Sequence, residues 1–95
     1  MYQQKVKTSI IKNLSRRGLI RDNISFKTVQ SLLGSLIEVT DVLTEKEKDV
    51  LRKRIFQFMT QREIARQYKV TPQWIMQLEH GAMAKLSRNI FNKQK

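Results

Sequence analysis

Three helix starts between residues 44 and 72 constrain the fold of this chain more than any other feature of its sequence. Residues 44–47 and residues 60–63 both read Thr-x-x-Glu, the pattern of a capping box, in which the threonine hydroxyl accepts the backbone N–H three residues later. At positions 71–72 a threonine precedes a proline, and proline suits the first position of a helix because no backbone donor is needed there. The sequence therefore predicts three successive helices, of which the second is short.

Apolar residues at helical spacing predict two further helices nearer the N-terminus. The first covers residues 3–17, and Gly18 stands where a left-handed residue would end it. The second begins after Ser25, a suitable N-cap, and contains Gly34, which predicts a close approach by another part of the chain. The two apolar stripes consist of Val6, Ile10, Ile11 and Leu14, and of Phe26, Val29, Leu32, Leu33, Leu36 and Ile37.

The helix that begins after Thr44 is expected to run to about Phe58, and the helix that begins at Pro72 to Arg88 or Phe91. The buried side of the former is expected to comprise Val50, Leu51, Ile55 and Phe58. Its outer face is expected to carry Lys46, Lys48, Arg52, Lys53 and Arg54. One Pro and three Gly leave few breaks for strands and tight turns, so we expect an all-α fold of about five helices.

The charge of the chain restricts its partners. Nineteen Lys and Arg oppose eight Asp and Glu, which gives a net charge of +11, and a small domain of this kind commonly binds nucleic acid. The absence of cysteine excludes a disulfide scaffold and a zinc finger. No apolar run approaches the roughly 20 residues of a membrane span. We therefore expect a cytoplasmic protein without a metal or other cofactor.

Residues 60–79 have the spacing of a helix-turn-helix, in which the first helix braces a second one that enters the DNA major groove. The inward positions are Ile64, Ala65, Tyr68 and Val70 up to the turn, and Ile75, Leu78, Ala82 and Leu86 after it. Lys69 occupies a turn position where glycine is common. A non-glycine residue in the left-handed conformation costs on the order of 1–2 kcal/mol there.

The outward face of the second helix follows from the same periodicity, and we predict that it contacts bases through Gln73, Met76, Gln77 and His80. A glutamine amide pairs bidentately with adenine, and a methionine side chain fits the thymine methyl group. Trp74 lies at the flank, where it would either pack on the sugar–phosphate backbone or fill a groove between helices. The predicted contacts with the DNA backbone are Arg52, Arg54, Arg62, Arg66, Lys69, Thr71, Trp74, Lys85 and Arg88.

Residues 43–88 resemble region 4 of bacterial sigma factors, the domain that reads the promoter −35 element. The resemblance is carried by the Leu-Thr start and the Val-Leu-Arg-x-Arg run within 43–54, by Glu-Ile-Ala at 63–65, Val-Thr at 70–71, Ile-Met-Gln-Leu-Glu at 75–79, and Ala-Met-Ala-Lys-Leu at 82–86. It implies a helix-turn-helix fold, double-stranded promoter DNA as a partner, and docking on core RNA polymerase.

Three positions depart from the family pattern. The family typically begins its recognition helix with Arg-Glu, where this chain has Pro72 and Gln73, and it has an arginine where this chain has Met76. Gln77 is kept and matches a base-contacting position of the family. These differences imply a DNA site other than the ordinary −35 hexamer, or a greater reliance on a protein partner.

We accordingly divide the chain into N-terminal amphipathic helices over residues 1–42, a sigma region 4-like domain over residues 43–91, and a frayed tail over residues 92–95. The first segment would serve as a brace, a surface for a homodimer, or a surface for a partner protein. The expected function is that of a stand-alone, sigma-like transcription regulator, similar to proteins encoded by phages and mobile elements.

Two alternatives of other classes stay open at this stage. One is an appropriator or anti-sigma protein that binds RNA polymerase with little specific reading of DNA. The other is a dimeric repressor or a DNA-packaging subunit with a helix-turn-helix. An enzyme is not expected, because one His, no Cys and no paired carboxylates form no recognisable catalytic set.

Overall fold

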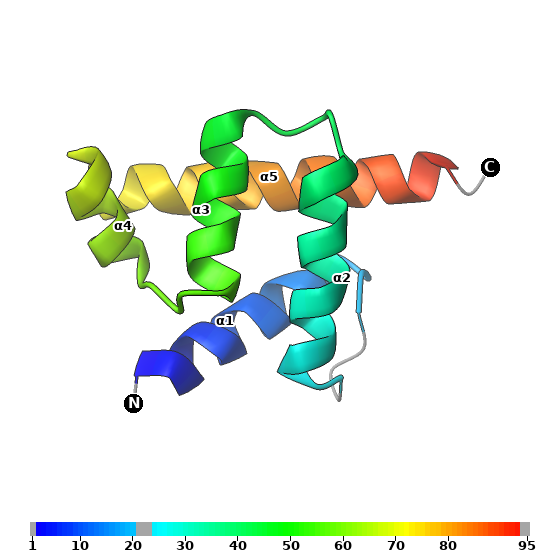
Figure 1. The fold of residues 1–95 in the computed structure, drawn as a ribbon, viewed down its shortest axis with the longest axis horizontal. Coiled ribbons are helices and arrows are strands. Elements are labelled where there is room, and N and C mark those ends of the chain that lie inside the picture. The colour runs from blue at the N-terminus through cyan, green and yellow to red at the C-terminus, as the bar shows by residue number, and fades with distance from the viewer. Residues whose placement is uncertain (1, 21–23, 94–95) are drawn as a thin grey trace.

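The computed structural model describes residues 2–20 and 24–93 and contains five helices in that part of the chain (Figure 1). They are α1 (Tyr2–Arg16), α2 (Phe26–Val39), α3 (Glu45–Ile55), α4 (Gln61–Tyr68) and α5 (Pro72–Lys93). No strand occurs within the described ranges, so the predicted all-α class is confirmed. None of the five helices is long and apolar enough to cross a membrane.

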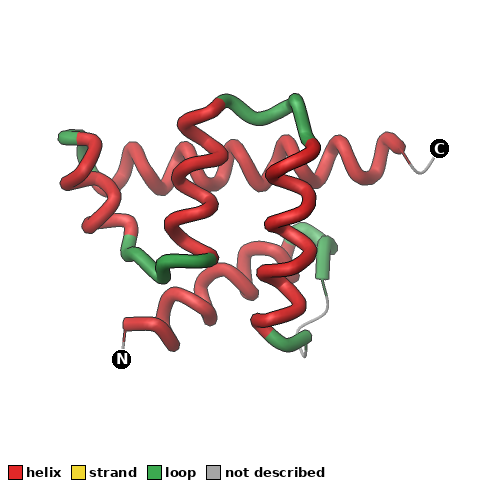
Figure 2. The backbone as a smooth tube through the Cα atoms, viewed as in Figure 1, coloured by secondary structure: helices red, strands yellow, loops and turns green. Residues whose placement is uncertain are grey.

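The longest helix, α5, organises the arrangement. It packs against α3 and α4, while α1 packs against α2 and α3. α2 and α3 pack side by side, and in Figure 2 the loop between them joins their two upper ends, so the two helices run antiparallel. Figure 1 shows α2 and α4 on opposite sides of α3, with α5 passing behind both α3 and α2.

Two apolar clusters hold the helices together. The larger joins four helices through Val6, Ile10 and Leu14 of α1, Val29, Leu33 and Ile37 of α2, Leu51 and Ile55 of α3, and Ala82, Met83 and Leu86 of α5. The smaller joins α3 to the helix-turn-helix and consists of Val50, Ile64, Ala65 and Ile75. The segments expected over residues 1–42 and 43–91 therefore share one core. The apolar stripes predicted the buried side of each helix but not which helices pack together.

The predicted starts of α2 to α5 and the predicted end of α1 are confirmed by their caps. In both capping boxes the threonine hydroxyl accepts the glutamate backbone N–H at 3.1 Å, and the glutamate carboxylate accepts the threonine backbone N–H at 2.8 Å. Ser25 caps α2, and Thr71 caps α5 by accepting the backbone N–H of Trp74 at 3.1 Å. Gly18 has a φ of 75° directly after α1, as a left-handed helix terminator requires.

The end of α3 differs from the prediction. The helix stops at Ile55 and does not reach Phe58, which is only half-buried and has a left-handed φ of 55°. The ring of Phe58 packs on that of Phe26, with 5.7 Å between centroids. The contact is between segments far apart in the sequence, so local helical spacing could not indicate it.

The apolar stripe of α2 is only partly covered. Leu32, at the edge of the stripe, is 50% exposed, because only the middle of the stripe is packed against other helices. Gly34 is closely approached as predicted, since a Cβ there would lie 2.9 Å from Cζ of Phe56. At its C-terminal end α5 continues to Lys93, beyond Arg88 and Phe91, and residues 94–95 of the expected frayed tail lie outside the described part of the chain.

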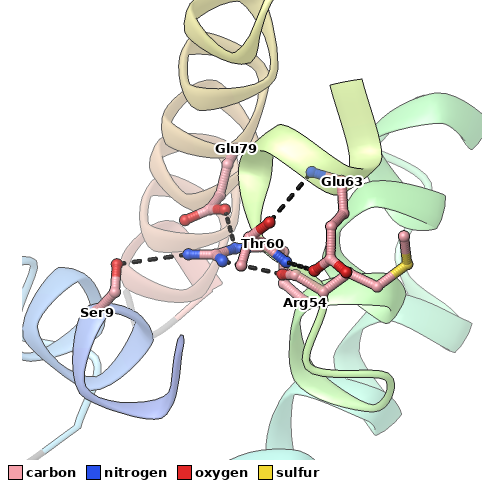
Figure 3. Close-up of polar contacts among 6 residues, drawn as sticks. Ser9, Arg54, Thr60, Glu63 and Glu79 are labelled. Carbon is pink, nitrogen blue, oxygen red and sulfur yellow. Dashed lines mark hydrogen bonds and ion pairs between the residues drawn. The ribbon is translucent and has the colours of Figure 1, made fainter. Parts of the chain in front are cut away.

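A buried ion pair between Arg54 and Glu79 fastens α5 to α3 (Figure 3). Their side chains are 4% and 1% exposed, and Nε of Arg54 lies 2.6 Å from Oε1 of Glu79. The guanidinium also donates to the carbonyl of Met59 at 3.1 Å and to Oγ of Ser9 at 3.4 Å. One cation therefore joins α1, α3, the loop after α3 and α5.

The ion pair corrects the placement of Arg54 on the outer face of its helix and, with it, the predicted phosphate contact. Arg54 directly precedes buried Ile55 and follows Leu51 by three positions, so it lies at the margin of the buried side, where only a carboxylate partner makes burial tolerable. The partner had a signal in the sequence. Glu79 is four residues after Ile75 and three before Ala82, which places a charge within the buried stripe of α5.

A second ion pair joins the start of α3 to α5. Glu47 is buried, and its carboxylate lies 2.9 Å from Nζ of Lys85. Burial alone would raise the pKa of Glu47, but hydrogen bonds from Thr44 and the ion pair with Lys85 outweigh it and hold that pKa below its ordinary value of 4.5.

Replacing Arg54 with Met is expected to lower the free energy of unfolding by about 3–5 kcal/mol, because Glu79 would stay buried without its cation. The double variant R54M/E79L removes both charges and is expected to recover much of that loss. Urea denaturation followed by circular dichroism measures both changes. An R54M variant at least as stable as R54M/E79L would contradict the role of the ion pair.

Glu47 is expected to make stability dependent on pH. Because its pKa is lower in the folded than in the unfolded chain, its contribution is complete above about pH 4.5 and is lost as the pH falls through the folded-state value. Glu47→Gln should therefore be less stable than the unsubstituted protein at neutral pH, and the difference should shrink on acidification. Urea denaturation at a series of pH values tests this, and a difference independent of pH would argue against it.

Candidate nucleic-acid interface

The turn between α4 and α5 has the geometry that a helix-turn-helix needs. Lys69 ends α4 in the left-handed conformation, with φ 59° and ψ 44°, so the strained position expected for this lysine is confirmed. Its backbone N–H donates to the carbonyl of Arg66 at 3.3 Å, and that of Val70 donates to the carbonyl of Ala65 at 3.0 Å. These two bonds close the end of α4 and direct the chain back into α5.

The inner faces of α4 and α5 pack as predicted. Ile64, Ala65 and Ile75 are each at most 1% exposed, and Val70 and Leu78 are partly buried against them. Ala65 stands where the two helices meet, since its side chain is small enough to allow a close crossing. The packing leaves the opposite face of α5 turned away from the core.

That opposite face carries the four residues predicted to contact bases. Gln73, Met76, Gln77 and His80 are all exposed, and their spacing of three, one and three residues keeps them on one side of the helix. They lie opposite the stripe that contains Glu79. The ion pair with Arg54 therefore also fixes the rotation of α5 that presents this row to the outside.

Trp74 is partly buried and packs against the small apolar cluster of the helix-turn-helix. Nζ of Lys46 lies 5.2 Å from the centre of its ring system, in a cation–π contact. These contacts favour the interpretation that the indole fills a groove between helices. Its contact with a DNA backbone stays a prediction.

A hydrogen-bond network holds α4 to α3. The hydroxyl of Tyr68 donates to Asp49, and Asp49 also lies 2.6 Å from Nζ of Lys53. Partial burial would raise the pKa of Asp49, but the bonds from Lys53 and Tyr68 outweigh it and lower that pKa. Burial and the Asp49 carboxylate raise the pKa of Tyr68 to about 12, so the hydroxyl stays a hydrogen-bond donor at neutral pH.

The residues predicted to contact phosphates fall into two groups. Arg62, Arg66, Lys69, Thr71 and Arg88 are exposed, and the first four of them belong to α4 and the turn beside the outward row. Arg52 and Lys85 are instead engaged by carboxylates of other helices: Arg52 lies 3.3 Å from Glu38 of α2, and Lys85 is paired with Glu47. The structure therefore does not bring these two to the edge formed by α4.

The chemistry available at this face is that of binding. Its exposed groups are amides, cations, a hydroxyl, an imidazole and a thioether. Within the described ranges, no group of three or more His, Cys, Asp or Glu side chains is placed to hold a metal ion. The face offers hydrogen-bond donors and acceptors to base edges and positive charge to phosphates.

Comparison with known proteins agrees with this geometry. A family model described as Sigma-70, region 4 matches residues 41–88, which comprise α3, α4 and most of α5. No curated protein and no solved structure matches the chain. The matched segment contains the capped helix-turn-helix, both ion pairs between α3 and α5, and the outward row of α5. The chain belongs to the sigma-70 region 4 family.

Proposed function

We propose that this protein is a sigma-like transcription regulator that contacts promoter DNA through α5. Sigma-70 region 4 domains are DNA-binding regulatory domains of transcription. The observation that carries the proposal is the exposed row of Gln73, Met76, Gln77 and His80 on a helix that a buried ion pair holds in a fixed rotation. A recognition helix works in this way, because one face must be anchored for the other to read DNA.

The dimensions and the chemistry of α5 support insertion into the major groove. A helix with its side chains is about 10–12 Å across, and the major groove is about 12 Å wide. Gln73 and Gln77 lie one helical turn apart, so each amide would meet a different base pair. The row has no arginine, and we therefore propose a site richer in A·T pairs than one read through arginine–guanine contacts.

Affinity that does not depend on sequence would come from the exposed cations of α4 and the turn, Arg62, Arg66 and Lys69. Each phosphate that a cation neutralises releases condensed counterions and makes binding more sensitive to salt. A helix-turn-helix positions itself through such contacts before base edges are read. The three cations are exposed on α4 and on the turn that leads into α5.

A second candidate function is binding to core RNA polymerase with little specific reading of DNA. It is favoured by a shallow groove of about 440 Å³ between α2 and α3, where Val39 is 79% exposed and Phe56 48% exposed. Large apolar side chains exposed together commonly mark a surface that binds another protein. The groove and the outward row of α5 belong to different helices, so binding of polymerase in the groove would leave that row free.

We predict that the double variant Q73A/Q77A loses its sequence preference but keeps its salt-sensitive affinity. Each amide–adenine pair contributes about 1–3 kcal/mol of discrimination, so affinity for the preferred site should fall at least about tenfold while affinity for mixed DNA stays near its original value. The preferred site is obtained by selection from a random DNA pool, and binding is then measured by fluorescence anisotropy.

Gln67→Ala provides the matched control, since Gln67 is an exposed glutamine of α4 outside the row. The control should retain the preference of the unsubstituted protein. Equal losses by Q73A/Q77A on the preferred and the mixed DNA would reject base reading by these amides. Failure of the selection to enrich any motif would favour the second candidate function.

The second candidate predicts that immobilised protein retains core RNA polymerase and that V39S/F56S abolishes this retention. Leu32→Ser is the matched control, because Leu32 is 50% exposed but lines a different apolar hollow, with Leu19 and Ile20. Retention that both variants leave intact would exclude the groove between α2 and α3 as the polymerase site.

A further inference from the structure

The outer face of α1 carries a row of polar and basic side chains. Lys5, Ser9, Lys12 and Arg16 follow one another at spacings of four, three and four residues and are all exposed. The opposite side of the same helix is buried in the core through Val6, Ile10 and Leu14. The orientation of α1 is thus fixed by packing, and the row faces outward.

The charge of this segment has one sign. Residues 2–20 contain five Lys and Arg and no Asp or Glu. Lys7 is turned toward the rings of Phe26 and Phe58, at 5.8 and 5.3 Å from their centres. In contrast, no carboxylate of the described residues lies within ion-pair distance of the cations of the row, Lys5, Lys12 and Arg16.

The row lies beside the outward face of α5. Lys12 and Arg16 of α1 and Met76 and His80 of α5 line one furrow of about 230 Å³. The row continues along α1 from this furrow to Lys5, through a second hollow that is also lined by Lys12. The base-reading edge of α5 therefore has α4 and the turn as one neighbour and the basic face of α1 as another.

The position of α1 relative to α5 is set by the same buried cation that holds α5. Arg54 of α3 donates to Ser9 of α1 and pairs with Glu79 of α5 (Figure 3). A shift of α1 away from α5 would break the bond to Ser9. The two helices consequently present their exposed faces in a defined relation.

We propose that α1 is a second DNA-contacting element, whose Lys5, Lys12 and Arg16 bind phosphates beside the major groove that α5 enters. The inference rests on the proposed function and adds a surface outside residues 41–88, the segment matched by the family model. The row spans about 16 Å along the helix, which is long enough to face several phosphates. Charge complementarity selects double-stranded DNA as the occupant, because the same furrow opens onto the base-reading row.

The test compares the salt dependence of DNA binding by three proteins: the unsubstituted chain, K12Q/R16Q and K27Q/K48Q. A mixed-sequence duplex is the probe, and anisotropy titrations at several salt concentrations give the slope of log K against log salt. For K12Q/R16Q the slope should become shallower by about 0.9 for each phosphate that is no longer neutralised, or about 1.8 for two phosphates. Sequence preference on the selected site should be unchanged.

K27Q/K48Q removes the same charge from other helices and is the matched control. Lys27 belongs to α2 and Lys48 to α3, and neither lines the furrow. The control should keep the slope of the unsubstituted protein. Thermal melting by circular dichroism should show all three proteins folded, since Lys12 and Arg16 are exposed.

The outcomes separate this inference from the proposed function. An unchanged slope for K12Q/R16Q, while the unsubstituted protein binds DNA, overturns the role of α1 and leaves the proposed function standing. Equal changes in both variants assign the effect to net charge and overturn the inference as well. Tighter binding by K12Q/R16Q also overturns it, and absence of DNA binding by the unsubstituted protein overturns both proposals.

Discussion

The ion pair between Arg54 and Glu79 is the constraint on which the rest of the structure depends. A charge buried in an apolar interior needs a partner in good geometry, so α5 is restricted to the rotation that brings Glu79 to the guanidinium. That rotation also decides which residues of α5 remain outside. The pair therefore specifies orientation, and replacement by apolar residues would test whether packing alone gives the same specificity.

Much of the fold follows from local signals in the sequence. The capping boxes at 44–47 and 60–63, the Ser25 cap and the left-handed Gly18 each involve neighbouring residues, so they were readable without a structure. The end of α3 could not be predicted from local signals, because Phe58 lies beyond the helix and packs on the ring of Phe26 in α2. The burial of Arg54 was missed for the same reason, since its partner is on another helix.

At the candidate interface, too, local signals predicted some features, whereas contacts between distant helices could not be predicted. Helical periodicity predicted the exposed row of α5, since the inner stripe from Ile75 onward leaves only one other face. It did not distinguish cations open to solvent from Arg52 and Lys85, whose carboxylate partners belong to other helices. Nor did it place α1 beside Met76 and His80, because the crossing of distant helices is set by the shared core.

The shared core has a thermodynamic consequence for α5. Met83 and Leu86 of α5 belong to one apolar cluster with residues of α1, α2 and α3, so the ordered state of α5 is coupled to helices outside the family segment. Anything that binds α2 only in its packed form also stabilises the packed form of α5, by mass action. Under the proposed function, the affinity of α5 for DNA is thereby linked to events on a helix that is not part of the outward row.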